Sequence, residues 1–192
     1  MEVKNIRDYL KPGRRAHLVG IGGVSMASLA EVLHGAGVEV TGSDQRESAT
    51  VLHLRALGIP VVIGHLPQSV EGAGCVVRTA AVHDANPEIA AALDAGIPVF
   101  ERAQAWGAIM RDYRNALCIS GTHGKTTTTS MCTHIFMAAR RDPTVMIGGT
   151  LPLLEAGHRV GRGDTIILES CEYCNSFLSF YPTVAVILNV EA

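Results

Sequence analysis

The sequence predicts an α/β fold in which short strands alternate with helices and pair into parallel sheets. Short apolar runs recur along the chain, and stretches with helical periodicity separate them. Two of the strand-to-helix turns are rich in glycine. The 192 residues include 20 glycines and few aromatic residues, a composition that suits helices packed closely against strands.

The first glycine-rich turn lies inside a strand-helix-strand pattern. The expected elements are a strand at 15–21, a helix at 27–35 and a strand at 38–42. With Asp44 about 20 residues after the turn, the pattern resembles a Rossmann dinucleotide-binding fingerprint. The third glycine of that fingerprint is replaced by Ser25, so the match to an NAD site is incomplete. The turn better predicts a diphosphate bound at Gly22, Gly23 and the helix start.

Helix and strand patterns keep alternating up to a charged break at 111–114. The expected strands are 61–63, 75–79 and 97–100, and the expected helices are 50–57, 86–95 and 101–110. A further apolar strand follows the break. We therefore expect a complete Rossmann-like parallel-sheet domain at residues 1–107, followed by part of a P-loop ATPase domain at residues 108–192.

The second glycine turn is Gly121-Thr-His-Gly-Lys-Thr126, between an expected strand at 116–119 and an expected helix at 127–139. Strand, Gly-Lys-Thr loop and helix are the context of a phosphate-binding loop, although Ile119 stands where the longer common pattern has its first glycine. The turn could also simply cap the helix. We expect ATP here, with Lys125 at the β- and γ-phosphates and the Thr126 hydroxyl on Mg²⁺.

Two carboxylates follow the strand expected at 164–168. Mg²⁺ in ATP sites is typically held by the loop Ser or Thr and by a carboxylate at a neighbouring strand end. Glu169 is the first candidate for that carboxylate and Glu172 the second, and a solvated acidic loop is the alternative. Cys171 and Cys174 form a single Cys-x-x-Cys, which could be a redox site or half of a zinc site, and we favour neither. No second such pair exists to complete a four-ligand zinc site.

Charge and composition exclude several classes of protein. The net charge of −2 gives no electrostatic reason to bind nucleic acid or an anionic membrane. No apolar run approaches the ~18 residues of a membrane span. The five cysteines have no disulfide-framework spacing, which favours a reduced, cytoplasmic setting. The chain stops at an apparent strand end, 183–192, and therefore looks cut short.

Several groups of residues, taken together, resemble the Mur ligases of bacterial peptidoglycan (cell wall) synthesis. Besides the phosphate loop they are Gly20–Met26, Thr41–Asp44, Thr79–Val82 with Asn86–Glu88, and Glu169–Tyr173 with Ser176–Phe177 before Asn189. These groups span nearly the whole chain in the family's order, so the resemblance is specific.

The resemblance implies a nucleotide site in each domain. In the family the first domain binds the UDP part of a nucleotide sugar. This places the diphosphate on Gly22, Gly23 and Val24, and the uridine near Ser43, Asp44, His65 and Thr79. The central domain would bind ATP through Gly121, Thr122, His123, Gly124, Lys125, Thr126 and Thr127. Lys125 would stabilise the transferring phosphoryl group, while Thr126 and Glu169 would hold Mg²⁺.

The activity implied is ATP-dependent ligation of L-alanine to the carboxylate of UDP-N-acetylmuramate through an acyl phosphate. The turn Gly20–Met26 favours this reaction over that of the recycling ligase, which attaches a whole peptide. The family pattern after Asn189 continues into Asp-His, the rest of the ATPase domain and an amino-acid-binding domain, none of which is in this sequence. We therefore expect these 192 residues alone not to ligate. A non-catalytic nucleotide-sugar-binding module and an NAD-dependent dehydrogenase are the other readings.

Overall fold

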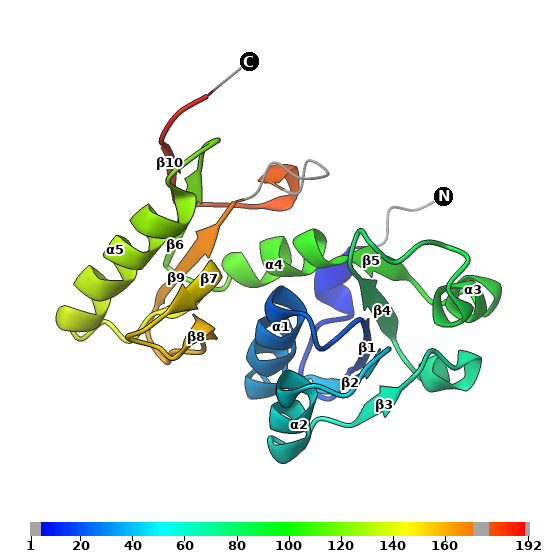
Figure 1. Cartoon of the computed structure of the whole chain (residues 1–192). Coiled ribbons are helices and arrows are strands. Elements are labelled where there is room, and N and C mark those ends of the chain that lie inside the picture. Colours follow the sequence, from blue (N-terminus) through cyan, green and yellow to red (C-terminus); the bar gives the residue numbers. More distant parts are fainter. Residues whose placement is uncertain (1–4, 171–176, 191–192) are drawn as a thin grey trace. The chain divides into compact units, whose positions relative to one another are not determined.

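The computed structural model describes residues 5–170 and 177–190. The chain divides into two compact units, residues 1–105 and 106–192. Each unit is built on a five-stranded sheet with helices packed on it (Figure 1). The predicted α/β fold is therefore confirmed.

The first unit has an entirely parallel sheet in the order β3-β2-β1-β4-β5. Its strands are β1 (Arg15–Val19), β2 (Glu39–Asp44), β3 (Val61–Ile63), β4 (Cys75–Arg78) and β5 (Val99–Glu101). At the carboxyl end of β1, Val19 lies beside Ser43 of β2 and Arg78 of β4. The strand order reverses between β1 and β4, and ligands in open α/β sheets bind at the carboxyl ends of strands at this point.

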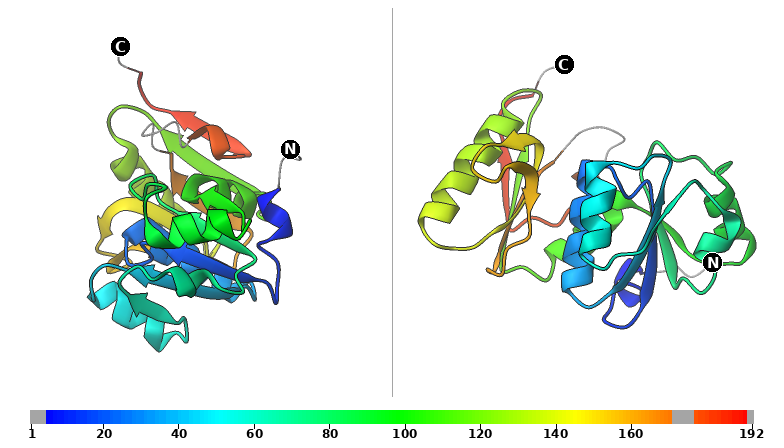
Figure 2. Two further views of the ribbon diagram at one scale, coloured as in Figure 1. Left: turned by 90° about the vertical axis from the view of Figure 1, so that its right-hand side faces the viewer. Right: turned by 60° about the horizontal axis from the view of Figure 1, so that its bottom comes forward.

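Helices cover both faces of the first sheet. They are α1 (Val24–Gly35), α2 (Ala49–Ala56) and α3 (Pro87–Asp94), with 3-10 turns η1 (Ile6–Asp8) and η2 (Pro67–Val70). Helix α4 (Arg102–Met110) follows β5 and leads from the first unit into the second. Figure 2 shows α1 and α2 on one face and α3 on the other. Beneath α3 and η2 lies an apolar core that contains Val19, Val70, Val76, Ile89 and Ala92. α3 starts where the sequence predicts, because the Asn86 side chain caps it and Pro87 fills its first turn.

The second unit has a mixed sheet in the order β10-β6-β9-β7-β8. Its elements are β6 (Asn115–Ser120), α5 (Lys125–Ala138), β7 (Thr144–Leu151), β8 (Ala156–Arg159), β9 (Thr165–Glu169) and β10 (Val184–Ile187). Four strands are parallel, and β8 pairs antiparallel with β7. The sequence did not predict β8, because its residues Ala-Gly-His-Arg lack the β-branched and aromatic side chains that mark strands.

Helix α5 begins at Lys125, two residues before the expected start. Gly124 caps it in the left-handed conformation, with φ of +82°. The threonine run 126–129 has two environments, because Thr126 is exposed whereas Thr129 is fully buried, as is Thr133 one turn further on. The Thr133 hydroxyl donates to the Thr129 carbonyl at 2.8 Å. Part of the run therefore serves packing, and only its first residues are available to a ligand.

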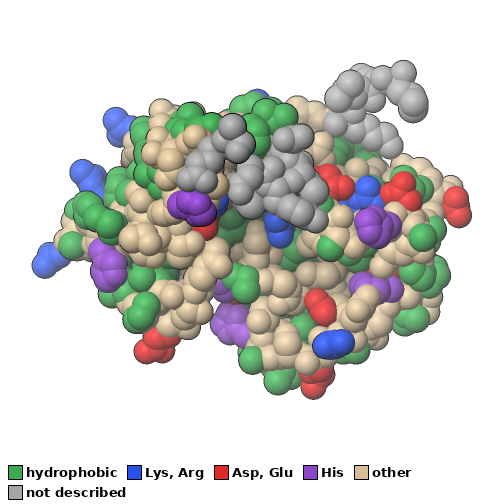
Figure 3. All heavy atoms as spheres, turned by 45° about the horizontal axis from the view of Figure 1, so that its top comes forward, with side chains coloured by type: hydrophobic (Ala, Val, Ile, Leu, Met, Phe, Trp, Pro, Cys, Tyr) green, Lys and Arg blue, Asp and Glu red, His purple; other side chains and the backbone are tan. Residues whose placement is uncertain are grey.

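Two features of the structure concern nucleic acid and membranes as partners. On the face shown in Figure 3, the Lys and Arg side chains of the described residues stand singly and form no continuous basic patch. Within the described part of the chain, no helix is both long and apolar enough to cross a membrane.

Candidate functional site

The glycine turn after β1 is held by the end of β2. The Ser43 carbonyl accepts hydrogen bonds from the N–H groups of Gly20, at 2.9 Å, and Ile21, at 3.0 Å. The Asp44 carboxylate accepts one from the Gly22 N–H at 2.8 Å. A Cβ at Gly22 would lie 2.8 Å from Asp44 Oδ2, so a larger residue there would push the carboxylate away. Gly22 in the glycine turn and Asp44 at the end of β2, both predicted for this site, are thus in direct contact.

The remaining residues predicted for the first site lie at the same end of the sheet, where its strands have their carboxyl ends. Gly23 is the N-cap of α1, and Val24 is its first residue, with an exposed side chain. N–H groups in the first turn of a helix have no intrahelical partner and attract anions. Thr79 directly follows β4, and its methyl group lies 4.0 Å from the place a Cβ at Gly20 would occupy. These positions place free helix N–H groups at the carboxyl ends of β1 and β4, where a diphosphate could bind.

His65, just after β3, joins this edge through a buried polar cluster. Its Nδ1 lies 3.2 Å from Ser43 Oγ and 2.9 Å from Glu88 Oε2. Glu88 sits in the first turn of α3 and is fully buried. Sequence reasoning noted Glu88 within a motif but gave it no role. The sequence signal that could have singled out Glu88 is its position directly after a helix-capping Asn and a proline.

The phosphate loop has the backbone that its glycines predict. Gly121 and Gly124 adopt φ of +145° and +82°, a region that disfavours other residues. The Lys125 ammonium donates to the carbonyls of Gly121, at 2.5 Å, and Thr122, at 3.3 Å. The loop therefore wraps around the ammonium, with the N–H groups of the first turn of α5 directly beside it.

Asn189, after β10, braces the loop in a way the sequence did not reveal. Its Oδ1 accepts from the His123 N–H at 2.9 Å, and its Nδ2 donates to the His123 carbonyl at 3.1 Å. Its backbone carbonyl accepts from the Thr122 N–H at 3.4 Å. The N–H groups of Thr122 and His123, both expected at the phosphates, thus face Asn189. The N–H groups at the start of α5, from Lys125 to Thr127, are the ones better placed for phosphate.

The predicted metal ligands meet a pair of glycines in β7. A Cβ at Gly148 would lie 2.7 Å from Glu169 Oε2, and a Cβ at Gly149 would lie 3.5 Å from Thr126 Cγ2. Glu169 Oε1 is buried and has no hydrogen-bond partner within the described residues. A buried carboxylate oxygen with unused capacity fits the oxygen ligands that Mg²⁺ prefers, and Thr126 lies against the neighbouring glycine. Glu172 lies outside the described residues.

No group of three or more His, Cys, Asp and Glu side chains in the described ranges could hold a metal by itself. A Mg²⁺ ion held by Glu169 and Thr126 would therefore need phosphate oxygens and water to complete its ligands. This requirement matches a metal that arrives with a nucleotide.

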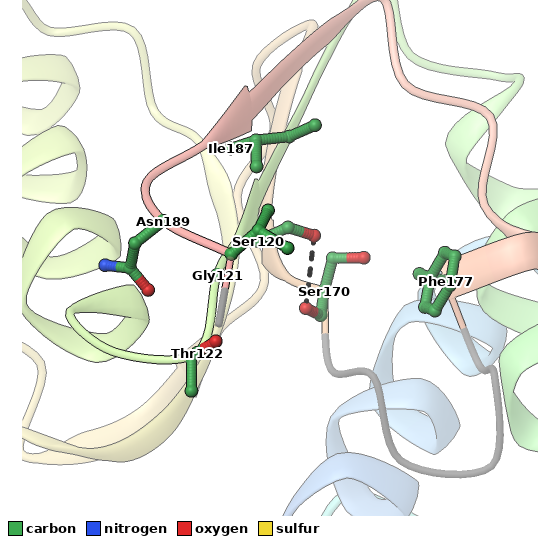
Figure 4. A pocket seen from close by; sticks show the side chains of 8 residues that line it. Ser120, Gly121, Thr122, Ser170, Phe177, Ile187 and Asn189 are labelled. Atoms are coloured by element: carbon green, nitrogen blue, oxygen red, sulfur yellow. Dashed lines mark hydrogen bonds between the residues drawn. The ribbon is translucent and has the colours of Figure 1, made fainter. Parts of the chain in front are cut away.

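A cavity of about 360 Å³ opens beside the phosphate loop (Figure 4). It is lined by Ser120, Gly121, Thr122, Ser170, Phe177, Ile187, Asn189 and Val190. The Ser120 hydroxyl donates to the Ser170 carbonyl at 3.3 Å and ties the ends of β6 and β9 together. The cavity therefore lies at the carboxyl edge of the second sheet, where the loop and Glu169 also lie.

Two of the described cysteines, Cys75 and Cys118, have unreactive buried thiols. Cys75, Cys118 and Cys132 are free. Burial raises the pKa of Cys75 and of Cys118 to about 12, so both stay protonated at neutral pH. Cys171 and Cys174 lie outside the described residues.

Comparisons with known proteins agree with this geometry. The sequence model of one family, described as the Mur ligase family, catalytic domain, matches residues 15–114, more than half of the chain. UDP-N-acetylmuramate--L-alanine ligase of Agathobacter rectalis is 48% identical over 186 residues, which cover 96% of this chain and 40% of that protein. The corresponding ligase of Clostridium novyi is 45% identical, with 96% and 41% covered. The chain thus spans about 40% of the length of the curated relatives it matches.

Solved structures give the same result. UDP-N-acetylmuramate-alanine ligase from Thermotoga maritima superposes with a TM-score of 0.81 and 32% identity, over 90% of this chain and 40% of that one. The UDP-N-acetylmuramate:L-alanyl-gamma-D-glutamyl-meso-diaminopimelate ligase from Neisseria meningitides superposes with a TM-score of 0.83 and 27% identity, over 93% and 61%.

Proposed function

Since the chain belongs to the Mur ligase family, we propose that it is the nucleotide-binding part of an ATP-dependent ligase that joins L-alanine to the carboxylate of UDP-N-acetylmuramate. The observation that carries this proposal is the arrangement of Glu169 and Thr126 against Gly148 and Gly149, beside a phosphate loop. This arrangement suits a Mg²⁺–nucleotide, and a second glycine turn in the same chain suits another diphosphate. The names of the relatives from Agathobacter rectalis and Clostridium novyi support UDP-N-acetylmuramate as the proposed substrate.

We assign the UDP site to residues 1–107. The diphosphate would lie on Gly22, Gly23 and Val24, where the start of α1 offers N–H groups. The nucleoside would lie toward Ser43, Asp44, His65 and Thr79. Asp44 has a second role as well, because its carboxylate keeps the glycine turn in shape.

We assign the ATP site to residues 108–192. ATP bound with Mg²⁺ would supply the phosphoryl group that activates the substrate carboxylate as an acyl phosphate, leaving ADP. Attack of the amine of L-alanine on that acyl phosphate would form the amide and release phosphate. Lys125 would turn from the loop carbonyls to the phosphates, and Thr126 and Glu169, or Glu172 in its place, would hold Mg²⁺. Residues 121–127 would orient the phosphates, so catalysis by this unit is positioning and charge stabilisation.

A peptide-attaching recycling ligase is the second candidate, because the Neisseria enzyme is structurally as similar as the alanine ligase. We favour the alanine-adding reaction because the ligases named for it reach 48% identity. Both reactions use ATP and a nucleotide sugar, which are cytoplasmic metabolites, so we assign the protein to the cytoplasm.

Calorimetric titration tests the proposal. The chain should bind UDP-N-acetylmuramate and, with Mg²⁺, ATP, and it should not bind NADH. Gly22→Val should abolish binding of the nucleotide sugar because the new side chain would displace Asp44. Gly35→Ala is the matched control, because a Cβ there meets nothing within 4 Å.

NADH binding without nucleotide-sugar binding would refute the ligase reading. Ligase turnover above background by the 192 residues alone would refute our expectation that this part is inactive by itself.

A further inference from the structure

The motif Asn86-Pro-Glu88 has no role in the function proposed so far. Asn86 Oδ1 accepts from the Glu88 N–H at 2.9 Å, which fixes the first turn of α3. The Glu88 side chain is fully buried on the sheet face that α3 covers. Burial of a carboxylate is costly unless it is hydrogen-bonded, so the contacts of this group need an explanation.

Glu88 lies between two histidines. On one side, Oε2 is 2.9 Å from His65 Nδ1 and accepts from the Ser43 hydroxyl at 2.5 Å. On the other side, Oε1 is 3.4 Å from His17 Nε2, an ion-pair distance that is long for a hydrogen bond. His17 Nδ1 is 3.0 Å from Thr41 Oγ1. The carboxylate therefore meets polar groups delivered by β1, β2 and the end of β3.

Glu88 is an anion in this environment. Burial raises its pKa, but the contacts with His17, Ser43 and His65 outweigh burial and leave the pKa below its ordinary value. An ionised carboxylate only accepts hydrogen bonds, so the groups that face it must donate.

This condition fixes the proton of His65. The single Ser43 proton goes to Glu88, so the Ser43 oxygen can only accept from the ring. His65 Nδ1 therefore faces two acceptors and must carry a hydrogen. In the neutral ring the lone pair is then on Nε2, which has no hydrogen-bond partner among the described residues. The side chain remains 12% exposed, at the edge where the nucleoside is expected.

We propose that Glu88 is a positioning residue that fixes His65 in the Nδ1–H tautomer, so that Nε2 accepts a hydrogen bond from the nucleoside. The partner chemistry is a neutral donor, either the imide N–H of the base or a ribose hydroxyl. This inference rests on the proposed UDP site of the first unit. It gives the Asn86-Pro-Glu88 motif a specific role in recognising that nucleoside.

Nitrogen-15 NMR of the histidine rings tests the tautomer without any ligand. The wild-type chain should show the hydrogen of His65 on Nδ1. Glu88→Gln can present either its amide oxygen or its NH2 group to Nδ1, so the hydrogen is no longer confined to Nδ1 and the fraction of rings with it on Nε2 should rise above wild type. His17→Gln is the matched control, since it changes an equally buried neighbour on the other side of the carboxylate and should leave the His65 spectrum unchanged. A wild-type spectrum with the hydrogen on Nε2 would overturn the proposal even if no variant folds.

Calorimetry with UDP tests the consequence for binding. Glu88→Gln should weaken UDP binding about tenfold, the loss of one hydrogen bond, and His17→Gln should not weaken it. In a His65→Ala background, Glu88→Gln should have no further effect, because it acts through His65. Equal weakening by Glu88→Gln and His17→Gln would show a merely structural role and would contradict the proposal.

Nucleotide analogues identify the donor. If it is the base, UDP methylated at N3 should bind wild type about tenfold more weakly than UDP, and 2′-deoxy-UDP should bind normally. The opposite pattern would identify the ribose. The Glu88→Gln variant should bind UDP and the analogue that binds wild type weakly with equal affinity, because the hydrogen bond in question is already lost. Equal binding of all three by wild type would overturn the nucleoside contact. Absence of UDP binding by wild type would refute the UDP site itself, while the ring spectrum would still report on Glu88 separately.

Discussion

The Asn189 side chain bonds to both backbone polar groups of His123, accepting from its N–H at 2.9 Å and donating to its carbonyl at 3.1 Å. This pair ties the end of β10 to the middle of the phosphate loop. Asn189→Ala should leave the loop less ordered and weaken ATP binding about three- to tenfold, because two exposed hydrogen bonds are lost.

Amide hydrogen exchange at residues 121–124 and calorimetry with Mg²⁺–ATP would measure these two effects. Asn189→Asp is the informative comparison, since it keeps the acceptor for the His123 N–H and loses the donor, so its effects should be intermediate. Unchanged exchange in Asn189→Ala would contradict the bracing role of this side chain.

Gly148 should be essential for metal binding while its neighbour is not. A Cβ at Gly148 would press on Glu169 Oε2 from 2.7 Å, and a Cβ at Gly149 would make an ordinary contact with Thr126 at 3.5 Å. Gly148→Ala should therefore weaken ATP binding in the presence of Mg²⁺ about tenfold or more and leave metal-free ATP binding unchanged. Gly149→Ala, the control, should behave like wild type in both titrations. A similar loss in both variants would argue against Glu169 as a ligand.

The two glycine turns could be predicted from sequence because their function depends on local backbone geometry. Gly121 and Gly124 have a positive φ that favours glycine, and a Cβ at Gly22 would crowd Asp44, so a local motif records these requirements. Asn189 and Glu88 could not be assigned roles, because each acts on a residue far away in the chain. Sequence periodicity shows which element a residue lies on, but not which side chain the topology brings to it.

The pairing of β1 with β2 should depend on glycine at position 42. A Cβ there would lie 2.7 Å from the Leu18 carbonyl and 2.6 Å from Ile21 Cδ1. The carbonyl belongs to the central strand and cannot move away, so Gly42→Ala should lower the free energy of unfolding by about 1–3 kcal/mol. Gly35→Ala, where a Cβ meets nothing, should be neutral or stabilise by about 0.4–1 kcal/mol. Urea unfolding would separate the two, and equal stabilities would show that β2 shifts freely.

The stability of the first unit should depend on pH through Glu88. Its pKa in the folded state is below the ordinary 4.5, since the contacts with His17, Ser43 and His65 outweigh the effect of burial. The ionised group therefore favours folding above pH 4.5, and this contribution disappears as the pH falls from 4.5 through the lowered pKa. Glu88→Gln removes the titration and should lower the free energy of unfolding at neutral pH by about 1–3 kcal/mol.

The difference in unfolding free energy between wild type and Glu88→Gln should thus shrink as the pH falls below 4.5. His17 and His65 are the titratable groups facing the carboxylate, so the same pair of measurements in a His17→Gln background separates the carboxylate from that histidine. Urea titrations at successive pH values supply the numbers. A difference that grows as the pH falls would mean that Glu88 is protonated in the folded protein. The hydrogen of His65 would then no longer have to be on Nδ1, because a protonated carboxyl group can donate to Nδ1 instead of accepting from it.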